Sequence, residues 1–529
     1  MIARYLEHKG VSDVSVVGGT GDKGADIVGS YNQKRWLVQA KYRSSGTTPR
    51  DAIEEAYNAS WHYDADVLIT ATNQKFTSGA INYRQELQDQ GFDMRLWNKD
   101  KILSFESLLP VDSILKRSLR QYQLDAVEKI HLSLDSERGK GLVTLATGLG
   151  KTIVASTFIS EYLEKNQNAK VLVLAHAIEL VRQLGRSCWS QLSKFIETHI
   201  WTDGESPVYS DGVTFATWQS VSSAMNNGEP LEGVFDLVVV DECHHAPSES
   251  FSSLLGYLRP KYLLGLTATP WRGDGASLRS LFGDPVFSMD IVQGMQEGYL
   301  AKVDYRMMLD GIDWDEIRLL SKQGLTIKDL NTKLYVPKRD IGMIEEVSEV
   351  IKKTKNASTL VFCRSIAHAN SLQAFFKQYD IAAGVLHSDL HRSVLFKNLS
   401  NFRMGKIRVL ISIEMLNEGI DVPEVNIVVF ARVTHSRRIF LQQLGRGLRL
   451  NDNKKHVTVL DFVADVRRIA AGYDLNEAAA GYKDRENVNY PNADIVKFTK
   501  YSQDFFTEYL ADMANIDDLD EDAHLDFPE

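Results

Sequence analysis

Short apolar runs alternate with stretches of helical spacing between Leu119 and about Pro270. Apolar runs that are separated by helices are typical of strands buried on both faces of a parallel sheet. The pattern therefore predicts a doubly wound α/β domain. Its expected strands are Leu142–Leu145, Val171–Ala175, Val213–Thr217, Leu237–Asp241 and Leu263–Thr267.

The same alternation returns between residues 336 and 470, which predicts a second doubly wound α/β domain. The stretch between the two domains, 271–335, has no regular pattern, and we group it with the first domain as a connector. The strands expected in the second domain are Thr359–Cys363, Ala383–Leu386, Val409–Ser412, Ile427–Phe430 and Val457–Asp461.

The first 108 residues predict a smaller α/β unit, in which helical and strand patterns are interleaved. The expected helices are Ile2–Lys9, one near Arg50–Trp61 and Ser78–Gln90. The expected strands are Val14–Val17, Asp26–Tyr31, Trp36–Tyr42, Asp66–Thr72 and Asp93–Leu96.

Four segments follow from these patterns: 1–108, 109–335, 336–470 and 471–529. Residues 109–119 act as a linker at the start of the second segment. The last segment is partly helical at Ser502–Met513 and then becomes acidic, with seven Asp or Glu and no Lys or Arg from Asp517 to the end. Such a charge run is typical of a solvated chain end.

Composition indicates a soluble protein of a reducing compartment. The 529 residues are 44% hydrophobic and 25% charged, as in ordinary globular domains. No apolar run approaches the ~18 residues of a membrane span, and the first residues lack the order of a signal peptide. Cys188, Cys243 and Cys363 are far apart in the sequence, which argues against structural zinc and for a cytoplasmic location.

The net charge of −10 is unevenly distributed. Residues 336–470 contain 21 Lys or Arg against 13 Asp or Glu. A local basic surface attracts a polyanion even on an acidic protein. The charge pattern is therefore compatible with a nucleic-acid partner.

A glycine-rich loop follows the first strand of the central domain and opens a helix, the context in which such loops bind phosphate. Backbone N–H groups of Thr147, Gly148 and Gly150 can converge on phosphate oxygens. We expect Lys151 to reach the β- and γ-phosphates of ATP and the Thr152 hydroxyl to bind Mg²⁺.

Two acidic residues end a later strand of the same domain. We expect Asp241 to lie beside Mg²⁺ and Glu242 to polarise the attacking water. The second domain supplies a complement, because Arg446 and Arg449 are three apart and share one face if helical. Two guanidinium groups from a facing domain can neutralise the charge that develops during γ-phosphate hydrolysis.

A second candidate chemistry lies in the first segment. Residues 19–24 spell GxGxxG, but the next residues read as a strand and not as the helix of a dinucleotide site. In the strand that follows, alternation places Gln39 and Lys41 on one face. If the preceding strand pairs with it as a hairpin, Asp26 comes alongside. An acid, a carbonyl and an ammonium can hold Mg²⁺ and stabilise a phosphate under attack. A surface hairpin without function is the simpler alternative.

Residues 119–465 resemble superfamily-two helicases and translocases. The resemblance rests on ordered segments across both domains, which implies two tandem RecA-like lobes. These segments are Arg120-Gln121-Tyr122-Gln123, GLGKT, Ala175-His176 with Glu179 and Leu180, Thr217-Trp218-Gln219-Ser220, DECHH, Thr267-Ala268-Thr269-Pro270, Val361-Phe362-Cys363-Arg364, His387-Ser388, Glu418-Gly419-Ile420-Asp421-Val422-Pro423 and Gln442-Gln443-Leu444-Gly445-Arg446-Gly447-Leu448-Arg449.

The helicase resemblance implies roles for residues that spacing alone does not assign. It implies adenine recognition by Gln123 with Arg120, and a place for Gln442 in the nucleotide site. It implies that His244 couples hydrolysis to lobe closure through Thr267 and Thr269. Contacts to the nucleic-acid backbone are implied for Thr217, Glu418 and Gly419.

The segments GDKGADIVG and WLVQAKYR resemble the Mrr-like branch of the PD-(D/E)xK nucleases, over roughly residues 1–105. The resemblance implies that Asp26 and Gln39 are metal ligands and that Lys41 is the catalytic lysine. Glu7, on the first helix, is a weaker candidate for the helical acid of this family.

Three functions remain open at this point. The first is an ATP-dependent DNA helicase or translocase with Mg²⁺-dependent cleavage, in prokaryotic restriction or anti-phage defence. The second is a helicase or remodeller whose first domain only binds DNA or a partner protein. The third is an RNA-directed ATPase, because the DExH box alone does not select the polymer. Defence partners and self-association are open as well.

Overall fold

The computed structural model describes residues 1–17, 23–134, 139–202, 211–246, 249–268, 275–308, 324, 339–363, 365–387, 389–413, 425–431, 447–448, 456–462 and 495–498. The predicted helix Ser502–Met513 and the acidic tail lie outside these residues. By its contacts the chain divides into two units. The first comprises Met1–Leu145, Gly150–Ser288 and Leu390–Lys397, and the second Ala146–Leu149, Met289–Asp389 and Asn398–Glu529.

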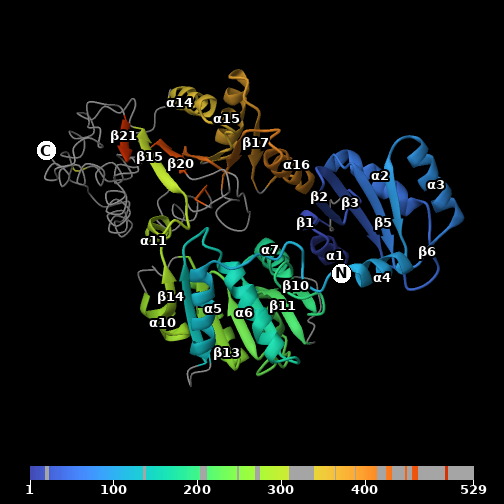
Figure 1. Cartoon of the computed structure of the whole chain (residues 1–529), viewed down its shortest axis with the longest axis horizontal. Helices are drawn as coiled ribbons and strands as arrows, with labels where there is room; N and C mark the ends of the chain where they lie inside the picture. Colours follow the sequence, from blue (N-terminus) through green and yellow to red (C-terminus); the bar gives the residue numbers. More distant parts are fainter. Residues whose placement is uncertain are drawn as a thin grey trace. The chain divides into compact units, whose positions relative to one another are not determined.

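The N-terminal domain is a mixed sheet with the order β1-β2-β3-β5-β7, covered by helices on both faces (Figure 1). Strands β1, β2 and β3 pair antiparallel, whereas β3, β5 and β7 are parallel. Its elements are α1 (Ile2–His8), β1 (Ser12–Val16), β2 (Ile27–Tyr31), β3 (Lys34–Lys41), β4 (Thr47–Thr48), α2 (Asp51–Tyr63), β5 (Val67–Thr72), β6 (Lys75–Phe76), α3 (Ser78–Asp89), β7 (Asp93–Trp97) and α4 (Lys99–Leu108).

Strand β3 separates two apolar layers, because successive side chains point to opposite faces. Trp36 and Val38 pack with α1 on one face. Leu37 packs with α2 and α3 on the other face. The sequence pattern predicted each strand of this sheet to within about two residues, and α4 was not anticipated.

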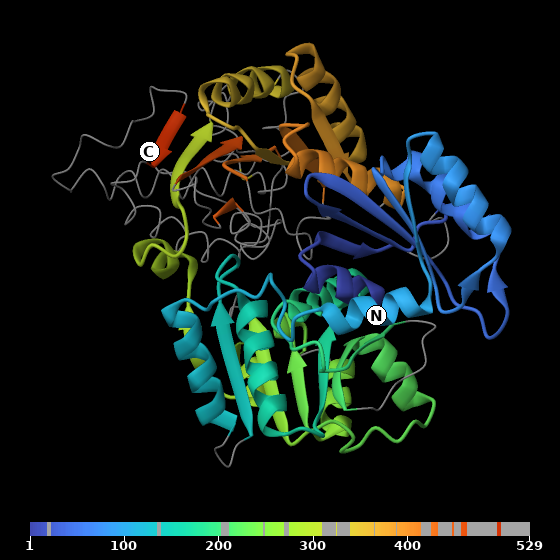
Figure 2. The same ribbon diagram turned by 45° about the vertical axis from the view of Figure 1, so that its right-hand side comes forward.

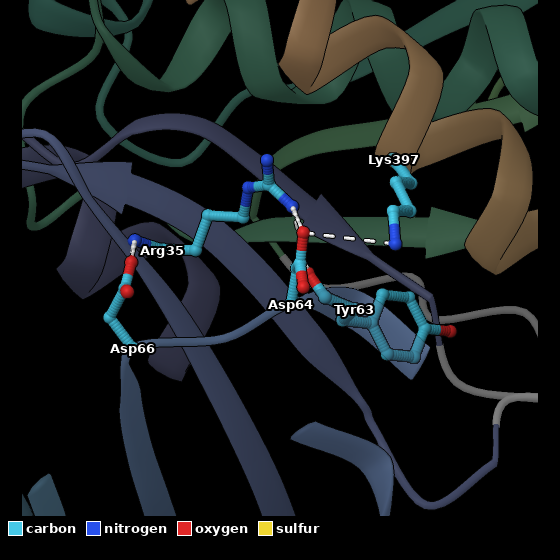
Figure 3. Close-up of polar contacts among 5 residues, drawn as sticks. All are labelled: Arg35, Tyr63, Asp64, Asp66 and Lys397. Carbon is cyan, nitrogen blue, oxygen red and sulfur yellow. Dashed lines mark hydrogen bonds and ion pairs between the residues drawn. The ribbon is translucent and has the colours of Figure 1, made fainter. Parts of the chain in front are cut away.

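Arg35 fastens β3 to the turn between α2 and β5 (Figure 3). Its backbone N–H donates to Asp66 Oδ2 at 2.8 Å, and its guanidinium donates to the Tyr63 carbonyl at 3.1 Å. Asp64 then lies between Arg35, at 3.5 Å, and Lys397 of α16 (Arg392–Arg403), at 3.7 Å. Asp64 is about half exposed, so these two ion pairs add little stability.

The first helicase-like sheet has the order β10-β11-β9-β12-β13-β8-β14 among the described residues. The neighbours from β10 to β8 are parallel. The elements are α5 (Gln121–Leu134), β8 (Lys140–Leu145), α6 (Lys151–Lys165), β9 (Lys170–Ala175), α7 (Ile178–Trp189), β10 (Thr198–Trp201), β11 (Gly212–Thr217), α8 (Trp218–Asn226), β12 (Leu237–Val240), the 3₁₀ turn η1 (Cys243–His245), α9 (Glu249–Leu258), β13 (Tyr262–Thr267), α10 (Gly275–Phe282) and β14 (Pro285–Met289).

Parallel pairing brings the carboxyl ends of five of these strands to one edge of the sheet. The glycine-rich loop follows β8, Asp241 follows β12, and Thr267 ends β13. His176 follows β9 and Thr217 ends β11. The candidate motifs of this lobe therefore share one edge, as expected for ligands of open α/β sheets.

The second helicase-like sheet has the order β17-β18-β16-β19-β20-β15-β21 among the described residues. Its neighbours are parallel except for the β15–β21 pair. The elements are α11 (Ile291–Gln296), β15 (Lys302–Met308), α14 (Arg339–Lys353), β16 (Thr359–Phe362), α15 (Ile366–Gln378), β17 (Ala383–Leu386), α16, β18 (Val409–Ser412), β19 (Ile427–Phe430), β20 (His456–Phe462) and β21 (Ile495–Phe498).

The stretch 271–335, which has no clear pattern in the sequence, contributes to both sheets. Strand β14 extends the first sheet beside β8, whereas β15 lies in the second sheet parallel to β20. The helical and strand segments described here include no helix long and apolar enough to cross a bilayer.

Gly265 on β13 permits close packing behind the acidic motif. An added Cβ would lie 2.7 Å from Phe282 Cδ1 and 3.0 Å from Cys243 Sγ, both of which are fully buried. We predict that Gly265→Ala lowers the free energy of unfolding by roughly 1–3 kcal/mol, because the core must shift. Thermal and urea unfolding would measure the change.

Gly256→Ala is the matched control. An added Cβ on Gly256, in α9, meets nothing within 4 Å, and alanine favours helix over glycine. Equal unfolding midpoints for the two variants would contradict the overpacking argument.

Candidate active sites

The glycine-rich loop has the backbone that phosphate binding requires. Gly148 (φ 95°) and Gly150 (φ 86°) both adopt the left-handed conformation, which costs glycine little. Lys151 begins the 15-residue helix α6, so the helix N-terminus and its positive dipole are at the loop. Thr147 lies in the loop before Gly148, and Thr152 is in the first helical turn.

Lys151 and Glu242 form a nearly buried ion pair. Lys151 Nζ lies 3.3 Å from Glu242 Oε1, and the two side chains are 11% and 13% exposed. Glu242 has φ 47°, a strained conformation for a residue other than glycine, and such strain is concentrated at functional sites. The lysine predicted for phosphate and the glutamate predicted for water are therefore brought together.

Asp241 lies at the same edge, where its backbone N–H donates to the Leu174 carbonyl at 2.9 Å. Burial, and then the Glu242 carboxylate, raise the pKa of Asp241 to about 7. A carboxylate that is costly to charge in isolation is stabilised by a nearby cation. With the Thr152 hydroxyl, Asp241 fits the set of oxygen ligands that Mg²⁺ prefers beside nucleotide phosphates.

His244 joins the acidic motif to β13. Its Nδ1 is 3.0 Å from Thr267 Oγ1 and 3.4 Å from Glu242 Oε2, and the ring is 2% exposed. A change at Glu242 can therefore reach the end of β13 through one side chain. Thr269, the other implied coupling residue, lies outside the described residues.

The adenine-recognition candidates lie over the phosphate loop. Gln123 Oε1 accepts a hydrogen bond from the Arg120 backbone N–H at 2.9 Å. A Cβ on Gly150 would lie 2.6 Å from Gln123 Nε2, so the glycine is needed for this close approach. The amide is 5% exposed and is held by the turn that begins α5.

The strand-tracking segments are connected to each other. Gln219 Nε2 donates to the His176 carbonyl at 3.1 Å. The Thr217 hydroxyl caps α8 by accepting from the Ser220 backbone N–H, and it is 4% exposed. Thr217 thus has a local structural role, and its implied contact to nucleic acid stays a proposal.

The site candidates of the second lobe are not among the described residues. Of the segment 442–449, the structure describes only Gly447 and Leu448. The candidates not described are Glu418, Gly419, Gln442, Arg446 and Arg449. Their roles remain predictions.

The hairpin expected in the N-terminal domain is present. Ile27 pairs with Val38 at the end of the β2–β3 ladder, and directly before it the Asp26 backbone N–H donates to the Val38 carbonyl at 3.0 Å. Asp26 Oδ2 accepts from the Ala40 backbone N–H at 2.7 Å. The Oε1 atom of Gln39 is buried and has no hydrogen-bond partner among the residues that the structure describes. An unpartnered buried carbonyl oxygen beside a carboxylate fits a divalent cation.

Lys41 has an acidic neighbour that the sequence did not reveal. Lys41 Nζ is 2.5 Å from Glu55 Oε2, and the side chains are 30% and 45% exposed. Gly24 (φ 89°) allows the loop before Asp26 to approach α2, because its Cβ would be 3.0 Å from the Glu55 carbonyl oxygen. Glu55 is 14 residues from Lys41, so only the packing of α2 on the sheet brings the two together.

Glu7 is not brought to this cluster. Helix α1 packs on the Trp36 and Val38 face of β3, whereas Gln39 and Lys41 alternate with them onto the α2 face. Glu7 is 8% exposed, and burial raises its pKa to about 8 although Arg4 opposes the shift.

Three family models match separate parts of the chain. Residues 1–105 match the model "Restriction endonuclease" of the Mrr catalytic type. Residues 116–272 match "Type III restriction enzyme, res subunit", and residues 342–451 match "Helicase conserved C-terminal domain". The chain joins an Mrr-type restriction endonuclease domain to a superfamily-two helicase.

Individual relatives match the helicase part of the chain. The helicase IRC3 of Saccharomyces cerevisiae is 26% identical over 65% of the chain and 51% of the relative. The DNA 3'-5' translocase XPB2 of Sulfurisphaera tokodaii is 27% identical over 64% and 80%. The Type I restriction enzyme EcoAI endonuclease subunit of Escherichia coli is 25% identical over 65% and 46%.

The chain spans 51% and 61% of the lengths of two yeast IRC3 relatives. Among solved structures, the ATP-dependent Type ISP restriction-modification enzyme LlaBIII bound to DNA aligns with a TM-score of 0.54 and 18% identity. The alignment covers 98% of this chain and 38% of that enzyme. This likeness concerns the fold.

The raised pKa of Asp241 leads to a pH-dependent stability. Asp241 holds its proton more tightly in the folded state, with a pKa of about 7 against an ordinary value of 3.8. The contribution of the protonated Asp241 carboxyl to the free energy of unfolding is therefore complete below pH 4. It is lost as the pH rises to about 7. We predict that Asp241→Asn, which cannot ionise, gains stability relative to wild type over this window, by on the order of a few kcal/mol.

Thermal unfolding without nucleotide or Mg²⁺, at several pH values from 5 to 8, would measure this difference. Asp211→Asn, at an exposed position in the same lobe, is the control and should show no such trend. A difference between Asp241→Asn and wild type that does not change with pH would refute the argument.

Proposed function

We propose that this protein is an ATP-driven DNA translocase that cuts DNA with its Mrr-type domain and acts in restriction of foreign DNA. The observation that carries the proposal is that Asp26 Oδ2 accepts from the Ala40 backbone N–H of β3, between Gln39 and Lys41, which share one face of that strand. This set occurs on one chain with the Lys151–Glu242 pair of a motor lobe.

The chain's own groups account for both reactions. In the motor, Lys151 balances phosphate charge, and Glu242 accepts a proton from the attacking water once the phosphates draw Lys151 away. In the nuclease, Asp26 and Gln39 supply oxygen ligands, and Lys41 stabilises the charge that develops on the attacked phosphate. Bound Mg²⁺ would polarise the phosphate and lower the pKa of the attacking water.

An exposed segment beside Lys41 supports a nucleic-acid substrate. Tyr42 is 86% exposed, although its backbone position is fixed. The next residue, Arg43, donates its backbone N–H to Asn73 Oδ1 at 2.9 Å and accepts from Asn73 Nδ2 at 2.8 Å. An aromatic ring and a guanidinium held at the edge of the site are suited to contacts with bases and phosphates.

The choice of DNA, and of restriction, is supported by the character of the relatives. Two of the three matching families are named for restriction enzymes, and a matched translocase is named for DNA. Helicase lobes grip the phosphate backbone, so the motor should be indifferent to sequence and sensitive to salt.

Separate variants should separate the two activities. We predict that Lys151→Ala and Glu242→Gln abolish ATP hydrolysis, because each removes a group that acts on the γ-phosphate. Asp26→Ala should abolish cleavage and leave nucleic-acid-stimulated ATPase intact. ATPase and cleavage would be measured in the same samples with duplex DNA, single-stranded DNA or RNA, with and without Mg²⁺.

The outcomes distinguish the alternatives. Absence of cleavage on every DNA, with ATPase present, would indicate a motor whose first domain only binds. Stimulation of ATPase by RNA and not by DNA would replace the proposal with an RNA-directed enzyme. Cleavage that persists in Asp26→Ala would remove this cluster from the reaction.

Glu55 provides a further test of the nuclease site. It holds the Lys41 ammonium at 2.5 Å, on the face that carries Gln39. We predict that Glu55→Gln slows cleavage roughly 10- to 100-fold, because Lys41 loses the partner that positions it. ATPase should not change. Initial rates of cleavage under saturating DNA would be measured.

Glu54→Gln is the matched control. Glu54 is the adjacent residue of α2 and pairs with Arg50 at 2.7 Å in an exposed contact. It should cut like the wild type. Equal rates for all three proteins would show that Glu55 is only a surface partner of Lys41.

A further inference from the structure

The N-terminal domain is docked directly on the first helicase lobe, beyond the linker that joins them. Helix α1 packs against α7 (Figure 2). Trp189 at the end of α7 is 6% exposed and belongs to the apolar cluster of the nuclease sheet. The buried guanidinium of Arg4 donates to the Ser193 carbonyl at 2.5 Å and to the Ile196 carbonyl. The two domains thus share a continuous interior.

Helix α7 reaches from the strand-tracking segment to the nuclease sheet. It begins at Ile178, two residues after His176, whose carbonyl is bonded by Gln219. Arg186 lies about 12 Å further along this helix, at ~1.5 Å per residue, and its side chain extends to the N-terminal domain. Its Nη1 donates to Ser15 Oγ at 2.9 Å and to the Val14 carbonyl at 3.3 Å.

Strand β1 accepts the hydrogen bonds of Arg186, and the residue that follows it is bonded to Asp26, the candidate metal ligand. Val16 pairs with Ile27, and the Val17 backbone N–H donates to the Asp26 carbonyl at 2.8 Å. Asp26 in turn accepts from the Ala40 backbone N–H. Ser15 is 7% exposed and also donates to the Asp13 carbonyl, so the point of attachment is itself fixed.

We propose that Arg186 is a positioning residue that fixes the nuclease site relative to the strand-tracking edge of the motor. This inference rests on the proposed function. The nuclease domain is then carried as one body with the first lobe, and DNA held near His176 is cut at a set distance from the motor. ATP hydrolysis then moves the DNA past the Asp26 site, and the nuclease domain does not change its position relative to the first lobe.

Arg186 bonds a different element of the N-terminal domain from the other interdomain residues, Lys194 and Arg4. Lys194 donates to the carbonyls of Leu109 and Glu106, at 2.7 and 3.2 Å, and so fastens the linker and the end of α4. Arg4 fastens α1. Arg186 bonds β1, the strand hydrogen-bonded to Asp26. Loss of Arg186 should therefore disturb where cutting occurs, whereas loss of Lys194 should not.

The test maps cut positions on end-labelled duplex DNA that carries a streptavidin block, with ATP and Mg²⁺. The wild type should cut in a narrow window at a fixed distance from the block. Arg186→Ala should broaden the window and lower ATP-stimulated cleavage roughly 10- to 100-fold, as misplacement of a site does. ATPase should be preserved. Arg186→Lys, which can still donate to one acceptor, should narrow the window again.

Two further variants keep the test specific. Ser15→Ala removes one acceptor and should act in the same direction, and the double variant should be no worse than Arg186→Ala. Lys194→Ala should cut like the wild type. Thermal unfolding of each variant separates misplacement from misfolding.

The failures are distinguishable. If the wild type does not cut any DNA, the proposed function fails and this inference fails with it. If the wild type cuts, and folded Arg186→Ala cuts in the same window at the same rate, only the positioning role is overturned.

Discussion

The parallel pairing of β8, β13, β12, β9 and β11 is the constraint on which the motor depends. Parallel strands end at one edge, so every motif that follows a strand in this lobe is delivered to the same edge. At that edge, charged side chains are buried. Lys151 and Glu242 are each almost withdrawn from water, and an ion pair at such a position is costly unless it is well matched.

The cost of burying these charged groups is consistent with a site that binds a charged ligand. Lys151 shares a small volume with the carboxyl groups of Glu242 and Asp241, and burial raises the pKa of Asp241 to about 7. A nucleotide with Mg²⁺ brings both a cation for the carboxylates and an anion for the lysine. The strained backbone of Glu242 (φ 47°) belongs to the same arrangement, since stored strain persists where the surrounding structure fixes it.

The nuclease domain reaches its chemistry by a different route. Two of its three candidate site residues, Gln39 and Lys41, lie on β3 and share a face by alternation, whereas Asp26 directly precedes β2. The fourth residue, Glu55, comes from a helix that covers that face. The same alternation separates Glu7 from the cluster, because α1 covers the opposite face.

The sequence by itself determined the two doubly wound lobes and the small α/β domain, and it predicted the residues of an ATP site. Buried strands and phosphate loops leave local patterns, because periodicity and glycine placement depend on neighbours along the chain. Tertiary structure alone decided that 271–335 is shared between two sheets, that Glu55 and not Glu7 stands beside Lys41, and that Arg186 grips β1. These facts depend on which face a helix covers and on contacts between residues as many as 172 positions apart. No pattern local in sequence encodes such contacts.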